Sequence, residues 1–186
     1  MAAPDITFAR LDGRQAAGHT DELQALHAEV YAEPPYRLAA DEAAFAERFR
    51  VQRRQPGFVL AEARSGDFLV GYATAMPLRP STSWWRELTT ALPDDVTAER
   101  PGRTFAVTEL VVRAPWRRQG IAETLYGLLM ADRPEERATL VVSPAAAAAQ
   151  GAFAKWGWRK VARTREPGAS PPVSDVLLTD LPAGQD

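Results

Sequence analysis

The stretch from Phe105 to Leu129 constrains the fold of this 186-residue chain more than any other segment. It begins with β-branched and apolar residues that favour a strand ending at Val112, and it continues through a turn that contains Pro115, two arginines and Gly120. Apolar residues at helical spacing follow, namely Ile121, Leu125, Leu128 and Leu129. A strand, a turn and a helix in this order are typical of domains in which helices cover a sheet.

The turn between this strand and this helix is suited to binding anions. Where a helix begins, several backbone N–H groups have no partner within the helix, and the helix dipole favours negative charge there. Gly120 allows a ligand to approach the backbone closely, and Ala122 keeps a nearby side chain small. Arg117 and Arg118 add positive charge. The pattern predicts a diphosphate site, and an ordinary basic surface loop ahead of an amphipathic helix is the alternative.

Hydrophobic periodicity predicts the other elements of the chain. Strands are expected at 6–10, 58–63, 68–76, 104–112, 139–142, 159–164 and 173–179. Two helices are expected after the predicted N-caps Thr20 and Asp41, and two more after Gly120 and over 145–156. The segments 78–103 and 166–172 lack periodicity and are expected to be loops; the longer one is expected to be functional or mobile, with room for a short helix.

This order of elements predicts the fold class. It reads strand, two helices, three strands, helix, strand, helix and two strands, which implies an α/β (α+β) fold with a mixed sheet of about seven strands flanked by helices. The wholly apolar run 139–142 is expected to be a central strand, covered on both faces. No repeat or linker interrupts the pattern, so a single domain over 1–186 is expected. Exposed terminal strands leave a homodimer open.

Composition excludes several classes of function. The chain has no cysteine, which rules out disulfides, thiolate nucleophiles and zinc–thiolate sites. His19 and His27, the only histidines, have no ligand cluster near them in the sequence, so we assign them to surface or helix positions and expect no metal. The net charge of −2 argues against a nucleic acid or an anionic membrane as partner. The lack of a signal pattern or a membrane span indicates a cytoplasmic protein, and the bias toward Arg and Ala indicates a bacterial one.

The turn also resembles a known family motif. In the GCN5-related N-acetyltransferase (GNAT) superfamily the acyl-CoA loop reads Gln/Arg-x-x-Gly-x-Gly/Ala, and residues 117–122, Arg-Arg-Gln-Gly-Ile-Ala, are similar to it. The segment 153–158, Phe-Ala-Lys-Trp-Gly-Trp, resembles the family's Phe/Tyr-x-Lys-x-Gly-Phe motif near the end of the last helix. The resemblance extends to the terminal strand pair and so covers most of the chain.

The resemblance implies the GNAT fold and an acyl-CoA-dependent N-acyltransferase that uses acetyl-CoA or another acyl-CoA without a metal. A primary amine would attack the thioester directly. The backbone of Leu110 would polarise the thioester carbonyl, and Val112, together with Val111, would hold the pantetheine arm. The diphosphate would lie on the acyl-CoA loop, whose residues are Arg117, Arg118, Gln119, Gly120, Ile121 and Ala122. The alternative is a catalytically weak acyl-CoA-binding or regulatory module.

Proton transfer is the least determined part of this expectation. Glu109 is our candidate base, and its alternative roles are to orient the acceptor or to stabilise the strand. The tyrosine that is common on the family's last helix is replaced by Phe153, so the general acid is unassigned. Ser143 could donate a proton, although we favour a role as helix N-cap ahead of Pro144.

The acceptor site is expected to involve aromatic side chains. Tyr36 follows the first helix, and Trp84 and Trp85 lie in the long loop, where aromatic rings suit a ring or a cation. The alternative for the two tryptophans is that they hold the loop onto the domain. A protein N-terminus and a small amine, including one of the aminoglycoside type, both stay open as acceptors, and the acyl length is undetermined.

Overall fold

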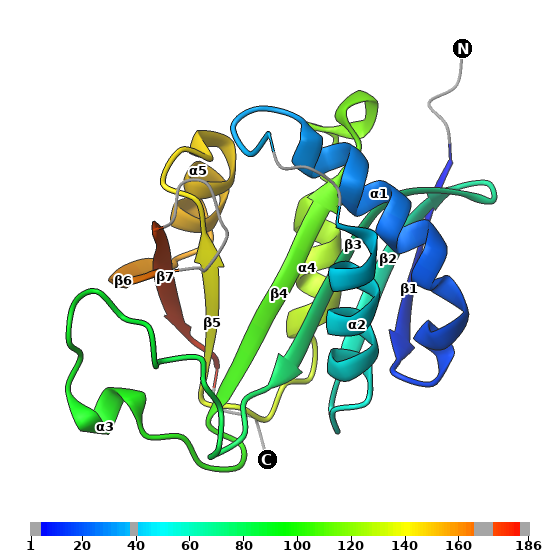
Figure 1. Cartoon of the computed structure of the whole chain (residues 1–186). Coiled ribbons are helices and arrows are strands. Elements are labelled where there is room, and N and C mark those ends of the chain that lie inside the picture. Colours follow the sequence, from blue (N-terminus) through cyan, green and yellow to red (C-terminus); the bar gives the residue numbers. More distant parts are fainter. Residues whose placement is uncertain (1–4, 38–40, 166–172, 183–186) are drawn as a thin grey trace. The chain divides into compact units, whose positions relative to one another are not determined.

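The computed structural model describes residues 5–37, 41–165 and 173–182, and the predicted loop at 166–172 lies outside them. Seven strands form one mixed sheet in the order β1-β2-β3-β4-β5-β7-β6, with helices beside it (Figure 1). This confirms the predicted fold class. The strands are β1 Ile6–Asp12, β2 Val59–Ser65, β3 Phe68–Pro77, β4 Thr104–Val112, β5 Arg137–Val142, β6 Arg159–Arg165 and β7 Val173–Asp180. The helices are η1 Gln15–His19, α1 Thr20–Ala32, α2 Glu42–Arg53, α3 Asp94–Thr97, η2 Ala114–Trp116, α4 Ile121–Met130 and α5 Ala147–Lys155.

The chain forms two compact units. The first comprises residues 1–76 and 108–131. Its strands β1, β2 and β3 pair antiparallel, and α1 and α2 lie on the opposite side of them from α4 (Figure 1). The apolar stripe of α1, which is Leu23, Leu26 and Val30, packs with Phe45 and Phe49 of α2. Burial of these side chains fixes both helices to the sheet.

A bulge in β3 gives the two faces of the sheet their different packing. Ala63 pairs with Gly71 while Arg64 pairs with Leu69, so Val70 is an extra residue on β3. Leu69 and Tyr72 therefore share the face covered by α1 and α2. A Cβ on Gly71 would lie 3.0 Å from a backbone oxygen and 3.3 Å from Cδ1 of Leu125, so a glycine allows α4 to pack closely.

The second unit comprises residues 77–107 and 132–186. Here β5 pairs in parallel with β4 from Thr104↔Arg137 to Val107↔Leu140 and antiparallel with β7, which confirms the predicted central strand. β6 pairs with β7 on one side. The other side of β6 is bridged to the long loop through Leu88 and Thr164, so this terminal strand is partly covered.

The helix starts show what local sequence signals determine. Asp41 is the N-cap of α2, as predicted, since its Oδ1 accepts a 2.9 Å bond from the Ala44 N–H. The N-cap predicted at Thr20 is wrong: η1 runs directly into α1, His19 is the N-cap, and the Thr20 hydroxyl donates to the Ala17 carbonyl instead.

Within the described residues, no helix is long and apolar enough to cross a bilayer.

The N-cap predicted at Ser143 is also wrong. A turn separates β5 from α5, which begins at Ala147 after Ala146 as N-cap, so Pro144 is not the first helical residue. The Ser143 Oγ accepts a 3.3 Å bond from the Ala145 N–H within that turn. Ser143 therefore supports the turn and does not start the helix.

Candidate functional site

The end of β4 presents backbone groups along one edge. The Arg113 N–H donates to the Val70 carbonyl at 2.9 Å, so residue 113 points its backbone groups toward β3. Because successive residues of a strand point to opposite edges, the N–H and C=O groups of Leu110 and Val112 point away from β3. The Val111 side chain lies in the core. This orientation suits the backbone roles expected for Leu110 and Val112.

The turn after β4 leads into α4 through a left-handed glycine. Gly120 has φ +80° and is the N-cap of α4 without a side-chain cap, so a glycine is favoured here. The first backbone bond of the helix runs from Thr124 N–H to the Gly120 carbonyl at 3.0 Å, so the amides of Ile121 and Ala122 precede it. A Cβ on Gly120 would meet nothing within 4 Å. The start of α4 is thus an open cradle of backbone amides.

Side chains of the turn hold its shape. Arg117 donates from Nε to the Val112 carbonyl at 2.8 Å and pairs through Nη1 with Glu33 at 2.8 Å. Gln119 donates from Nε2 to the Pro115 carbonyl at 3.0 Å. Arg118 is exposed and has φ +64°, an unfavourable backbone conformation for a residue with a Cβ. One arginine of the motif therefore orders the turn, and the other is exposed to solvent.

Glu109 is the centre of a polar cluster on the face of β4 that carries Val111. Its Oε2 accepts a 2.9 Å bond from the Tyr31 hydroxyl. Its Oε1 lies 3.4 Å from Nη2 of Arg48 and 3.5 Å from Nε2 of His27. The Glu109 side chain is 11% exposed, so α1 and α2 hold it in a nearly buried, hydrogen-bonded setting.

The charge of the Glu109 carboxylate affects the pKa values of three tyrosines. Burial, and then the negative charge of Glu109, raise the pKa of Tyr31 and of Tyr72 well above the usual value. Burial and Glu109 also raise the pKa of Tyr36, and the opposing effect of Arg117 is smaller. The Tyr72 hydroxyl is buried and has no hydrogen-bond partner in the structure. All three phenols are therefore neutral at physiological pH.

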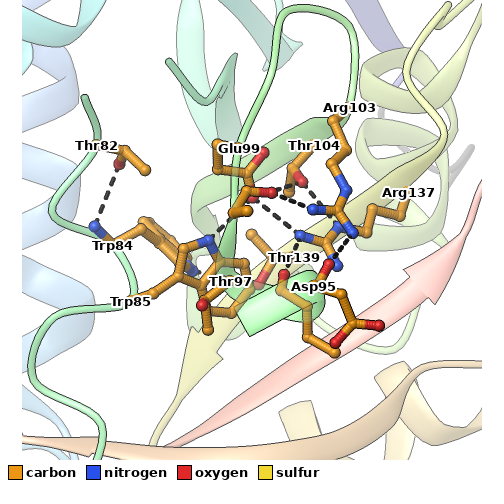
Figure 2. A network of polar contacts seen from close by, with 12 residues as sticks. Thr82, Trp84, Trp85, Asp95, Thr97, Glu99, Arg103, Thr104, Arg137 and Thr139 are labelled. Carbon is orange, nitrogen blue, oxygen red and sulfur yellow. Dashed lines mark hydrogen bonds and ion pairs between the residues drawn. The ribbon is translucent and has the colours of Figure 1, made fainter. Parts of the chain in front are cut away.

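The predicted acceptor residues lie in different surroundings. Tyr36 packs against Tyr31, with ring centroids 4.7 Å apart, and so lies beside the Glu109 cluster. Trp84 and Trp85 belong to the second unit, where Trp84 donates from Nε1 to the Thr139 hydroxyl at 3.3 Å. Trp85 is 9% exposed and donates from Nε1 to Oε1 of Glu99 at 2.9 Å (Figure 2). These contacts agree with the loop-holding alternative, and a role of either tryptophan in acceptor binding stays a prediction.

Glu99 connects the long loop to two strands. Besides Trp85, its Oε1 accepts bonds from the Thr104 hydroxyl at 2.8 Å and from Nη2 of Arg137 at 2.9 Å (Figure 2). The Arg137 guanidinium lies 5.4 Å from the centroid of the Trp85 ring. The Glu99 side chain is 1% exposed. This network fixes the loop to β4 and β5.

Three residues of the Glu109 cluster were not singled out from the sequence as site residues. His27 and Tyr31 lie one turn apart on α1 and stack with ring centroids 4.3 Å apart, and Arg48 comes from α2. The spacing of His27 and Tyr31 to the apolar stripe of α1 places these two residues near the core but does not indicate a carboxylate partner. Only the tertiary contact with β4 identifies them.

Comparisons with known proteins give the family. The model of the acetyltransferase (GNAT) family matches residues 20–158. The fold is similar to a GNAT-family acetyltransferase from Staphylococcus aureus Mu50, with 13% identity, a TM-score of 0.68, and coverage of 96% of this chain and 100% of that chain. It is also similar to the ribosomal-protein-S18-alanine N-acetyltransferase of Escherichia coli, with 14% identity, a TM-score of 0.62, and coverage of 98% and 97%.

A third solved structure of the same fold contains a CoA compound. Naa50 of Arabidopsis thaliana, in complex with the bisubstrate analogue CoA-Ac-MVNAL, has 14% identity, a TM-score of 0.60, and coverage of 94% of this chain and 97% of that chain. A search of curated protein sequences gave no significant match. The family match spans most of the chain and includes the strand, turn and helix described above, so this protein belongs to the GNAT acetyltransferase family.

Proposed function

We propose that this protein is an N-acyltransferase that transfers an acetyl group from acetyl-CoA to a primary amine, with the whole chain acting as one catalytic domain. The observation that carries the proposal is the cradle at the start of α4. There, Gly120 at φ +80° leaves open space above amides that have no partner within the helix. Residues 117–122 fit a diphosphate because both the backbone geometry and the charge favour an anion.

The edge of β4 complements this cradle. Acetyl-CoA, when bound, supplies an activated thioester. The backbone groups of Leu110 and Val112 point away from β3 and can bond to a carbonyl and to an amide-containing arm lying along that edge. The Val112 carbonyl already accepts one bond from Arg117, and a carbonyl oxygen can accept a second.

Glu109 would bind the acceptor ammonium and remove its proton. Its hydrogen bond to Tyr31 fixes one oxygen, and its other oxygen has only longer contacts to Arg48 and His27. That second oxygen is free to accept a proton from the amine or from a water between them. Tyr36, next to this cluster, would line the acceptor side.

The acceptor class is proposed from the similar structures. Two of them are named for protein or peptide acceptors, an S18 alanine and a CoA-linked MVNAL peptide. Peptides with N-terminal alanine and with the sequence Met-Val-Asn-Ala-Leu are therefore the first acceptors to test. A small polyamine and an aminoglycoside form the second group.

The test measures binding and turnover separately. Titration calorimetry with acetyl-CoA is expected to show micromolar affinity, and release of the free thiol of CoA is expected to accelerate with at least one acceptor. Lack of binding by a folded protein would overturn the proposal.

A weak binding module is the second candidate function, because Phe153 has no hydroxyl. Its ring is buried between Trp156 and Trp158, at centroid distances of 5.6 and 5.7 Å. Phe153 is thus a packing residue. Binding of acetyl-CoA without turnover of any acceptor would favour this candidate.

A further inference from the structure

His27 has two polar neighbours of opposite charge on the same ring nitrogen. Its Nε2 lies 3.5 Å from Oε1 of Glu109 and 3.5 Å from Nη2 of Arg48. With a proton on Nε2 the ring donates to the carboxylate, and without one it accepts from the guanidinium. Both tautomers of the neutral imidazole therefore have a partner in place.

The ring is held in position but still reaches solvent. It stacks on Tyr31 at 4.3 Å and lies 4.8 Å from the Phe45 ring, so α1 and α2 fix it from two sides. Its side chain is 21% exposed, whereas that of Glu109 is 11% exposed. His27 thus lies between a nearly buried carboxylate and water.

We infer that His27 carries to solvent the proton that Glu109 removes from the acceptor amine. This inference rests on the proposed function. His27 acts through Glu109 and is a positioning and proton-carrying residue, with no contact to the substrate required. An imidazole is ordinarily a stronger base than a carboxylate, so a protonated carboxyl group passes its proton to the ring readily.

The proton transfers balance. An ammonium N–H bond breaks, the proton binds Glu109, and the nitrogen keeps the electron pair with which it attacks the thioester carbonyl. The proton then moves from Oε1 of Glu109 to Nε2 of His27, and the resulting imidazolium loses a proton to water. As the C–N bond forms and the C–S bond breaks, the nitrogen loses its second proton, which passes through water to the departing thiolate.

Charged groups of opposite sign face the ring. Glu109 on β4 attracts the imidazolium, Arg48 on α2 repels it, and the Tyr31 phenol on α1 is neutral. Once the carboxylate has lost its proton it again pairs with the ring and with Arg48.

The main test is chemical rescue with a matched control. The variant His27→Ala is expected to lower kcat about 100-fold with acetyl-CoA and the best acceptor peptide, while KM for acetyl-CoA changes less than twofold. Added imidazole is expected to restore at least a tenth of the wild-type kcat. His19→Ala is the control, because His19 also pairs with a carboxylate, Glu62, at 3.1 Å. It is expected to keep its activity and to be insensitive to imidazole.

A second variant separates proton transfer from packing. His27→Gln keeps a side chain of similar length, and its pH–rate profile is expected to lose an ionisation that the wild type shows. An unchanged kcat in both His27 variants, or a loss of kcat without rescue and with an unchanged pH profile, would overturn the inference. Because acetyl-CoA binding is measured separately, this failure is distinguishable from failure of the proposed function.

A third measurement does not depend on the acceptor. Nitrogen-15 spectra of the two histidine rings report which nitrogen carries the proton. Glu109→Gln is expected to change the ring spectrum of His27 and to leave that of His19 unchanged. An unchanged His27 spectrum would show that the two residues do not share a proton and would overturn the inference.

Discussion

Glu33 and Arg117 form a 2.8 Å ion pair that joins the residue after α1 to the turn before α4. The same guanidinium donates to the Val112 carbonyl, so one side chain connects the residue after α1, the end of β4 and the proposed diphosphate cradle. A bound diphosphate would compete with Glu33 for this charge.

Removing the Glu33 charge is therefore expected to strengthen acetyl-CoA binding. Glu33→Gln is expected to lower Kd about two- to fivefold, since a partly exposed pair of this kind contributes up to about 1 kcal/mol. Titration calorimetry at two salt concentrations measures the effect. Glu22→Gln is the control. It also removes one negative charge, from the α1 residue that pairs with Arg64, and it is expected to change Kd little. Equal effects of both variants would disprove a specific role for Glu33.

Gly120→Ala is expected to separate cofactor binding from stability. The left-handed backbone at φ +80° costs a residue with a Cβ about 1–2 kcal/mol, and the added methyl group would occupy the open cradle. We expect Kd for acetyl-CoA to rise at least tenfold. Gly66→Ala is the matched control, with φ +59° and open space around its Cβ, and it is expected to lose similar stability without loss of affinity. Thermal unfolding and calorimetry check both.

Glu109→Gln is expected to lower kcat about 100-fold and to change the affinity for acetyl-CoA less than threefold, because the amide still accepts from Tyr31 but is not a base. Glu62→Gln is the control, since Glu62 is also nearly buried and contacts a histidine and an arginine. It should lose stability and keep kcat. Steady-state kinetics with unfolding curves distinguish the two, and an active Glu109→Gln would remove this residue from the mechanism.

Because of Asp175, the free energy of unfolding is expected to depend on pH in the acidic range. Burial by itself raises the pKa of its carboxyl, but Lys160 at 2.6 Å and Arg163 at 3.2 Å outweigh burial and hold the pKa below the usual value. A pKa that is lower in the folded state adds stability above the unfolded-state pKa, and this stability is lost as the pH falls through the folded value.

Asp175→Asn is accordingly expected to cost about 2 kcal/mol at pH 7, the size of a hydrogen bond to a charged group. The difference from wild type should begin to shrink as the pH falls to about 4, the unfolded-state pKa of an aspartate, and should continue to shrink toward the lower folded-state pKa. Urea unfolding from pH 7 to pH 3 measures this difference in the free energy of unfolding. A difference that is constant with pH would contradict a lowered pKa of Asp175.

Glu99→Gln is expected to loosen the long loop. The variant leaves the nearly buried Arg137 without its countercharge. Removing one partner of a buried ion pair lowers the free energy of unfolding by about 3–5 kcal/mol. Glu136→Gln, at a half-exposed pair with Arg100, is expected to cost less than 1 kcal/mol. Tryptophan fluorescence should report exposure of Trp85 in the first variant only.

The sequence alone determined the parts of this protein that depend on near neighbours. The strand Thr104–Val112, the turn with Gly120 and the apolar stripe of α4 follow from strand propensity, a left-handed glycine and helical spacing, all of which act over a few residues. The Asp41 cap was predicted for the same reason. The caps predicted at Thr20 and Ser143 were wrong because η1 and the turn after β5 satisfy those backbone groups differently.

Only the tertiary structure decided which side chains surround Glu109 and how the tryptophans are held. Tyr31 and Arg48 bond to Glu109 across 78 and 61 residues of sequence, and Trp84 bonds to Thr139 across 55. Such pairs form because α1, α2 and the long loop are folded against particular strands by burial of their apolar faces, which brings together polar groups whose sequence neighbourhoods contain no sign of one another.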